Sequence, residues 1–122
     1  MQTQEQQFGI DSESMAVSYL KEHGYKIIMR NYRTKFGEID IIAKDGDTIV
    51  FVEVKARKSR AYSPKEAVTK NKKRKISMVA LHYLKSTRQV NFRARFDVVA
   101  IGSGNNSGAV EIIKNAFELA YG

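Results

Sequence analysis

Two strand-forming segments joined by a tight turn constrain the fold of this 122-residue chain more than any other feature. The segments are Glu38–Ala43 and Thr48–Ala56, and Lys44-Asp45-Gly46-Asp47 stands between them. Both segments are rich in strand formers, and an Asp-Gly pair between two such segments is typical of an antiparallel hairpin. We therefore predict that they form neighbouring strands of one sheet.

A helix and a strand are expected before this hairpin. In Phe8–His23 the apolar residues recur near the spacing of a helix with one buried face, and Gly24 supplies a C-terminal stop. Tyr25–Tyr32 is rich in strand-forming residues, although its apolar and polar positions alternate imperfectly. We predict a strand there that leads into the hairpin.

A second helix is predicted after the hairpin. Ser63 is a suitable N-cap, Pro64 is a favoured first helical residue, and the apolar stripe that follows extends to about Leu84. A strand, a loop and a short last strand complete the chain: Phe96–Ile101, Gly102–Gly108 and Val110–Ile113.

The order of these elements indicates the fold class. A helix, three strands, a helix, a strand and a short final strand are expected to form an α/β protein whose helices pack on a mixed central sheet. The length of 122 residues is typical of one domain, and no segment has the composition of a linker. We therefore predict a single domain over residues 1–122.

The composition excludes several kinds of protein and of site. Because the chain has no cysteine, it has no disulfide or thiolate site, and a metal would be held mainly by oxygen. His23 and His82 lie on predicted helices without a partner at metal-ligand spacing, and we expect both to be structural. No apolar run approaches the roughly 20 residues that span a bilayer, and Met1–Gln7 lacks the apolar region of a signal peptide. We expect a cytoplasmic protein without membrane association.

The formal net charge of +8 favours a polyanionic partner, with nucleic acid first. The alternative is that the excess lysine only keeps the protein soluble. The tract Lys70–Lys75 covers more than one helical turn, so its charges cannot all share one face of the helix. These side chains are either simply solvated or bind the phosphates of a nucleic acid. The residues expected to contact nucleic acid are Arg57, Lys58, Arg60, Lys70, Lys72, Lys73, Arg74 and Lys75. Such contacts position a backbone without reading its sequence, which suits a structure-selective protein.

Charged residues interrupt the apolar strands of the predicted hairpin. Because side chains alternate along a strand, Glu53 and Lys55 project from the same face. The same alternation puts Glu38, Asp40 and Ile42 on one face, which antiparallel pairing can set beside Glu53 and Lys55. Two carboxylates and an ammonium group are therefore expected to converge.

Two interpretations of this cluster remain open on spacing alone. In the first, Glu53 and Lys55 form an ordinary exposed pair that contributes little stability. In the second, the charges are buried, which costs several kcal/mol unless a cation offsets that cost. Mg²⁺ would do so, because it binds one or two carboxylates and fills its other positions with water and phosphate oxygens. The Val54 carbonyl is a conceivable further ligand, and Lys55 could then orient a water or neutralise charge in the transition state.

Two motifs, Gly37-Glu38-Ile39-Asp40 and Phe51-Val52-Glu53-Val54-Lys55-Ala56-Arg57, resemble the signature of the YraN family of bacterial proteins. The resemblance covers nearly the whole chain, through Glu13-Ser14-Met15-Ala16, Tyr19-Leu20, Gly24-Tyr25, Arg30-Asn31-Tyr32-Arg33, Ala67-Val68 to Lys72, Arg95-Phe96-Asp97-Val98-Val99 and Asn115-Ala116-Phe117. That family is similar to the PD-(D/E)xK nucleases, and especially to archaeal Holliday-junction resolvases, which share the predicted order of elements. The resemblance therefore implies a restriction-endonuclease-like core.

Residue by residue, the resemblance also implies an active centre. Asp40 matches the metal-binding Asp of those nucleases, Glu53 the second acidic ligand, and Lys55 the catalytic lysine. Glu13 matches a helix glutamate that reaches the same metal region, although on charge alone it would be a solvated helix residue. One departure is Ile39, which stands where the motif has proline.

Two further residues border this implied centre. Lys72 matches a position where related nucleases have Gln or Lys near the metal. Glu38 is either another ligand or, as we expect because Mg²⁺ seldom binds several carboxylates, a residue that orients Lys55 or an arginine.

The expected function is that of a nuclease dependent on Mg²⁺ or Mn²⁺. It would hydrolyse DNA, select structure rather than sequence, and act in repair or recombination. Symmetric cutting of a DNA junction needs two active centres, which a homodimer would supply. No segment of the sequence has the features of a subunit interface. Two alternatives stay open: a nucleic-acid-binding module on the same fold without catalysis, and a protein-interaction domain.

Overall fold

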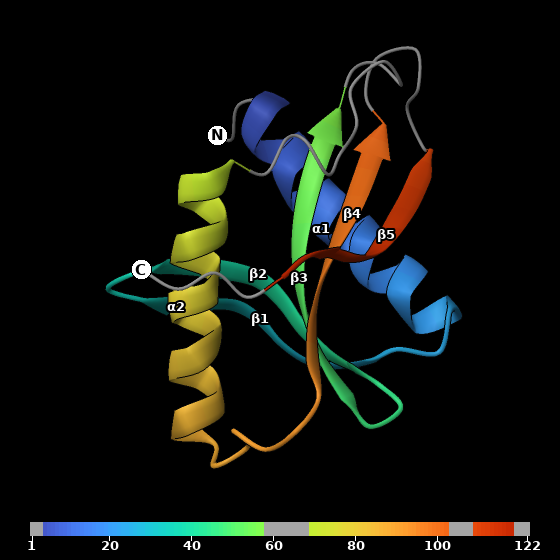
Figure 1. Ribbon diagram of the computed structural model, residues 1–122. Coiled ribbons are helices and arrows are strands. Elements are labelled where there is room, and N and C mark those ends of the chain that lie inside the picture. The colour runs from blue at the N-terminus through green and yellow to red at the C-terminus, as the bar shows by residue number, and fades with distance from the viewer. Residues whose placement is uncertain (1–3, 58–68, 103–108, 119–122) are drawn as a thin grey trace.

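A five-stranded sheet with one helix on each face is formed by residues 4–57, 69–102 and 109–118, the part of the chain that this computed structural model describes (Figure 1). The elements, in chain order, are α1 (Gln4–Glu22), β1 (Lys26–Thr34), β2 (Gly37–Asp45), β3 (Thr48–Arg57), α2 (Lys70–Ser86), β4 (Ala94–Gly102) and β5 (Val110–Phe117). The strands lie in the sheet in the order in which they occur along the chain.

The sheet is mixed because of one connection. β3 and β4 run parallel, whereas every other neighbouring pair is antiparallel. Parallel neighbours need a crossover, and α2 lies in the segment between these two strands. The predicted α/β fold, with helices on a mixed central sheet, is confirmed, and it is consistent with a restriction-endonuclease-like core.

The predicted hairpin is present between β2 and β3. Asp45 pairs with Thr48, so Gly46 and Asp47 alone connect the two strands. Gly46 has a φ of 61°, which glycine adopts without the steric cost that a side chain would impose. The turn therefore fixes the register that aligns the two strands.

The core has two layers, one on each face of the sheet. On the α1 face, Leu20 packs with residues of β2, β3 and β4 that include Val52. On the α2 face, Val79 and Tyr83 pack with a different set that includes Phe51. Neighbouring residues of β3 thus enter opposite layers, as the alternation predicted. Because both faces of β3 are covered, the side chain of a charged residue on this strand is at least partly buried.

The second helix begins later than predicted. Its N-cap is Thr69, whose side-chain oxygen accepts a hydrogen bond from the backbone N–H of Lys72 at 3.2 Å. The expected cap Ser63 and first residue Pro64 lie outside the described residues, and the helix that carries the basic tract starts at Lys70. Threonine is a good N-cap, but the sequence offered two such residues before the same apolar stripe.

The last strand is longer than predicted, because it continues from Val110 to Phe117. Asn115 has a positive φ of 54°, and the pairing of β5 with β4 shifts register beside it. This irregularity lets the strand resume, so that Phe117 pairs with Phe96. The predicted loop was Gly102–Gly108: Gly102 is instead the last residue of β4, and residues 103–108 lie outside the described part of the chain.

The predicted placement of Glu38, Asp40 and Ile42 on one face was wrong. Ile41 and Ile42 enter opposite core layers as expected, but Ile39 enters the same layer as Ile42. The alternation is therefore interrupted around Asp40, and the pairing of β2 with β3 extends no further than Ile41. The physical reason is an irregular backbone at this level of the sheet rather than a regular pleat.

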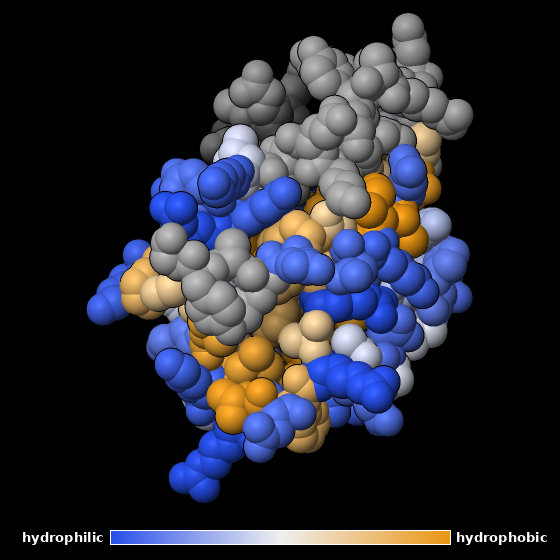
Figure 2. Space-filling model, viewed as in Figure 1, coloured by the Kyte–Doolittle hydropathy of each residue, from blue (hydrophilic) through white to orange (hydrophobic). Residues whose placement is uncertain are grey.

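The surface of the described elements is mainly polar. Hydrophilic residues cover the start of α2 on the face seen in Figure 2, and hydrophobic residues gather lower on that face. Among the residues that the structure describes, no helix combines the length and the apolar character needed to cross a bilayer.

Candidate active site

Asp40 and Glu53 come together where β2 separates from β3. Figure 1 shows β2 turning away from β3 toward α2 beyond their paired region. Past the last pair, Asp40 Oδ2 accepts a hydrogen bond from the backbone N–H of Val54 at 2.8 Å. Val54 directly follows Glu53 on β3, so this hydrogen bond holds the Asp40 carboxylate beside Glu53.

The two carboxylates share a poorly solvated site. Glu53 is only 7% exposed and Asp40 is half-buried. Burial, and then the negative charge of Glu53, raise the pKa of Asp40 to about 7, against the lowering effect of the Val54 hydrogen bond. Two carboxylates placed in this way ionise together only when positive charge is near.

Two lysines supply positive charge on the α2 side of Glu53. Lys55 Nζ lies 3.3 Å from Glu53 Oε1, and Lys72 Nζ, from the first turn of α2, contacts the same oxygen. Burial and the neighbouring Lys72 lower the pKa of Lys55, although Glu53 opposes this shift. Burial alone would lower the pKa of Lys72, but its contacts, first of all with Glu53, raise it. Lys55 is therefore the lysine that gives up its proton more readily.

The remaining basic residues differ in their surroundings. Lys70, Arg74 and Lys75 are exposed on α2. Lys73 is half-buried, and its Nζ lies 5.8 Å from the centre of the Phe117 ring. Arg57 is the last residue of β3, whereas Lys58 and Arg60 lie outside the described residues. The structure thus brings one residue of the predicted basic set, Lys72, onto the carboxylates.

Glu13 of α1 and Glu38 of β2 both contact residues of β1. Glu13 Oε2 lies 3.5 Å from Arg30 Nη2, and Glu38 Oε2 lies 3.3 Å from Arg33 Nε. We assign the Asn31 amide with its nitrogen toward both carboxylates, because in the opposite orientation its oxygen would face only other acceptors. In this assignment the nitrogen donates to Glu38 Oε1 at 2.9 Å and to Glu13 Oε1 at 3.3 Å. Glu13 also contributes to the raised pKa of Asp40, so its charge acts on the carboxylate pair. The sequence interpretation did not single out Asn31.

The carboxylates fit a cation that takes few ligands from the protein. Within residues 4–57, 69–102 and 109–118, no three His, Asp or Glu side chains gather as a complete metal cage. Mg²⁺ is commonly bound by one or two carboxylates and keeps several waters. Asp40 and Glu53 supply two such groups, with the Val54 carbonyl as the predicted third oxygen. After burial, the negative charge of Glu53 is the next cause of the raised pKa of Asp40, and a divalent cation between the two carboxylates would offset that repulsion.

The two histidines make contacts away from this pair. His23 Nδ1 lies 2.7 Å from the carbonyl oxygen of Tyr19, and the two rings stack with centroids 4.0 Å apart. His82 Nδ1 lies 2.8 Å from the hydroxyl of Tyr32. These contacts give each ring a structural role.

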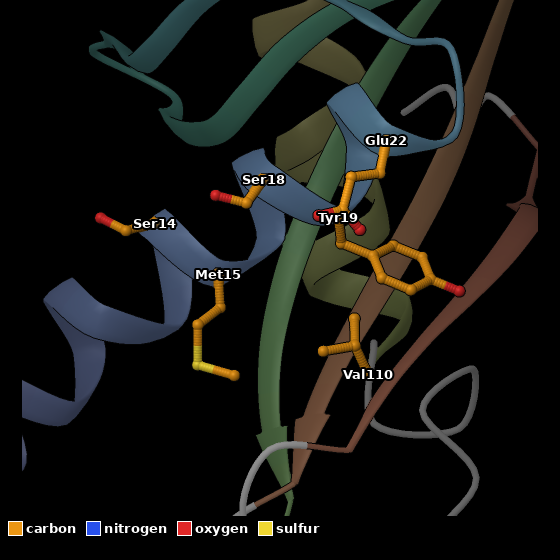
Figure 3. Close-up of a pocket in the computed structure, with 6 residues that line it drawn as sticks. All are labelled: Ser14, Met15, Ser18, Tyr19, Glu22 and Val110. Atoms are coloured by element: carbon orange, nitrogen blue, oxygen red, sulfur yellow. The ribbon is translucent and has the colours of Figure 1, made fainter.

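An open pocket of about 560 Å³ lies elsewhere, between α1 and β5 (Figure 3). Its lining residues are Ser14, Met15, Ser18, Tyr19, Glu22 and Val110. Tyr19 reaches across toward the side of Val110, whereas Ser14 and Ser18 point away from it. The described residues of the lining include no carboxylate pair and no lysine, so we place the candidate active site at Asp40 and Glu53.

Comparison with known proteins places the chain in a family. The model of a family described as "Uncharacterised protein family UPF0102" matches residues 12–101, which include Asp40, Glu53 and Lys55. A UPF0102 protein of Syntrophus aciditrophicus is 53% identical over 121 residues, which are 98% of this chain and 95% of the relative. A UPF0102 protein of Desulfosudis oleivorans is 55% identical over 119 residues, 97% of this chain and 95% of the relative.

A third relative agrees with these two. A UPF0102 protein of Geobacter metallireducens is 54% identical over 114 residues, which are 93% of each chain. The identity is high and extends over nearly the full length of all three relatives. The resemblance that the sequence motifs indicated is thus confirmed: the chain belongs to the UPF0102 family, that of the YraN proteins.

Proposed function

We propose that this protein is a metal-dependent nuclease that hydrolyses phosphodiester bonds of DNA at Asp40, Glu53 and Lys55. One observation carries the proposal: two carboxylates share a poorly solvated site, and two lysines lie at its edge. Carboxylates that hold a hard cation, together with an ammonium group near the scissile phosphate, are the groups that metal-assisted phosphodiester hydrolysis requires.

Each residue has a distinct task in this proposal. Asp40 and Glu53 would hold Mg²⁺ or Mn²⁺, with the Val54 carbonyl as a further ligand. When bound, the cation would neutralise charge on the phosphate and lower the pKa of a bound water. Lys55, with its lowered pKa, would orient the attacking water or stabilise charge on the phosphate. Lys72 would leave Glu53 as the cation takes its place, and would then be free to contact the substrate.

The substrate class follows from the exposed cations near the start of α2. Lys70, Arg74 and Lys75 would contact phosphates, and such contacts carry no base sequence. We therefore propose selection by DNA structure, in repair or recombination within the cytoplasm. Symmetric cutting of a branched substrate would require two copies of the chain, which makes a homodimer part of the proposal.

The test is cleavage of labelled linear, nicked, flapped and four-way DNA, and of RNA, with Mg²⁺ or Mn²⁺. Wild type is compared with Glu53→Gln, which keeps the shape of the side chain and removes its charge. Glu22→Gln, at an exposed position of α1, is the matched control. We expect metal-dependent cutting that falls by about a hundredfold or more only in Glu53→Gln, because the variant lacks a ligand charge. Equal cutting by all three proteins would contradict the proposal.

A second candidate is a nucleic-acid-binding module without catalysis. It is favoured by the contacts of Glu53 with Lys55 and Lys72, which already neutralise this carboxylate as a structural ion pair would. Such a module would bind DNA without metal, and Glu53→Gln would bind as tightly as wild type. Binding of this kind, with no cutting by either protein, would favour the module over the nuclease.

A further inference from the structure

Asn31 adopts a backbone conformation that is uncommon within a strand. It lies in β1 with a φ of 55°, between two residues that pair with Ile41 and Ile39 of β2. Asparagine tolerates this left-handed region better than most residues, although it is a poor strand former. The conformation breaks the alternation of β1 at the level of Asp40.

The amide of Asn31 connects two carboxylates from different elements. It donates to Glu13 of α1 and to Glu38 of β2, and each of these carboxylates has its other oxygen near an arginine. The arginines Arg30 and Arg33 flank Asn31 on the same strand. One short stretch of β1 thus holds both oxygens of both carboxylates.

The arginines alone would hold these carboxylates loosely. The side chains of Arg30 and Arg33 are 39% and 75% exposed, and ion pairs at such exposure contribute little. In its assigned orientation the amide contacts both carboxylates at once, and it lies between two like charges that would otherwise separate. Asn31 therefore links Glu38 to Glu13, the carboxylate whose charge acts on Asp40.

We infer that Asn31 is a positioning residue of the proposed nuclease site: it links Glu38 to Glu13, so that these carboxylates would support a divalent cation held by Asp40 and Glu53. The inference rests on the proposed function. Mg²⁺ keeps several of its waters when bound by a protein, and carboxylates behind the ligands orient those waters. Loss of such outer partners typically weakens metal binding by about 10 to 100 times.

The test measures affinity for Mn²⁺ alone by titration calorimetry, without nucleic acid. Asn31→Gly removes the amide and keeps the positive φ, so the shape of the strand is preserved. Asn115→Gly is the matched control, because Asn115 has the same backbone conformation on β5 with a φ of 54°. We expect Asn31→Gly to bind Mn²⁺ about tenfold or more weakly, with Asn115→Gly unchanged.

A second measurement asks whether Asn31 acts through Glu13 and Glu38. Replacing both glutamates by Gln is expected to weaken Mn²⁺ binding, and adding Asn31→Gly to these two changes should weaken it by less than about twofold more, because coupled residues are not additive. If the substitutions acted independently, their fold-losses in Mn²⁺ affinity would multiply. A purely structural role for Asn31 would lower the melting temperature and leave this coupling absent.

The outcomes separate the inference from the proposed function. If wild type binds Mn²⁺ and Glu53→Gln does not, the site exists, and unchanged binding by Asn31→Gly then overturns the inference alone. If wild type binds no Mn²⁺, the proposed metal site fails, and the role of Asn31 fails with it.

Discussion

Glu53 is a carboxylate inside a sheet of apolar residues, stabilised as an anion by two lysines at one oxygen. Its side chain is 8% exposed, so that an unpaired charge there would be costly. A cation that binds Glu53 must compete with Lys72, whose raised pKa keeps it charged. In the proposed metal site, the lysine and the cation would therefore be alternative partners of one carboxylate.

Replacing Lys72 tests this competition at the residue scale. Lys72→Met leaves Glu53 with Lys55 as its remaining lysine, and we expect a loss of about 1 to 2 kcal/mol in the free energy of unfolding without metal. Urea denaturation measures it, with Lys75→Met at an exposed position of the same helix as control. An equal loss in both variants would show that Lys72 is not a special partner of Glu53.

At this scale the sequence predicted some relations and missed others. The shared face of Glu53 and Lys55 followed from alternation, since β3 is regular, and the structure brings them within 3.3 Å. The face of Asp40 did not follow, because the irregularity lies at Asn31 on a neighbouring strand. An asparagine within a strand is a signal of such irregularity, but it does not say which carboxylates the amide will bind.

At the scale of elements, the β2–β3 hairpin is tied to the sheet by a network at its turn. Asp45 Oδ2 lies 2.7 Å from Arg95 Nη2, and Arg95 also binds the buried Asp97 of β4. Asp97 accepts hydrogen bonds from the hydroxyl of Tyr25 and from the backbone N–H of Asn115. The turn, the start of β1, β4 and β5 are therefore joined through one arginine and one carboxylate.

This network predicts a pH dependence of stability. The hydrogen bond from Arg95 lowers the pKa of Asp45 below its usual value near 4. The contribution of Asp45 is therefore present above that value and is lost as the pH falls through the lower folded-state pKa. We expect Asp45→Asn to be less stable than wild type by up to about 1 kcal/mol at pH 7, and by less than this near pH 2.

Thermal unfolding at both pH values measures the difference, and Asp47→Asn, exposed in the same turn, is the control. A difference between wild type and Asp45→Asn that does not shrink on acidification would contradict the role of the ion pair. The hairpin itself was predictable, since its signal is local. The start of α2 was not, because both Ser63 and Thr69 are suitable caps and local sequence does not choose between them.

At the scale of the whole molecule, α1 and α2 cover opposite faces of one sheet, and the exposed cations of α2 lie near the end of the sheet where Glu53 and Lys55 sit (Figure 1). The element order and the net charge of +8 indicated this general design. What composition did not indicate is that one lysine of the basic tract turns inward to Glu53. A run of basic residues predicts a positive electrostatic potential, but it does not predict which group each lysine or arginine contacts.

The positive charges of α2 lead to a prediction of how the affinity for DNA depends on salt concentration. If Arg74 and Lys75 contact phosphates, the slope of log affinity against log salt should become less steep by about 0.9 for each residue replaced by alanine. Binding of a labelled four-way junction at several salt concentrations measures the slope. Lys85→Ala, at the other end of α2, should leave it unchanged. An unaltered slope in Arg74→Ala and Lys75→Ala would place the DNA on another surface.

The bond between Asp40 and Val54 has a spectroscopic consequence. The amide hydrogen of Val54 is held by a side-chain oxygen rather than by the backbone of a neighbouring strand. The NMR chemical shift of this amide hydrogen and its rate of exchange with deuterium therefore depend on the charge of Asp40. They also depend on any ligand that moves the Asp40 carboxylate away from Val54. A single backbone resonance of β3 thus serves as a built-in reporter for occupancy of the site, readable before any substrate is known.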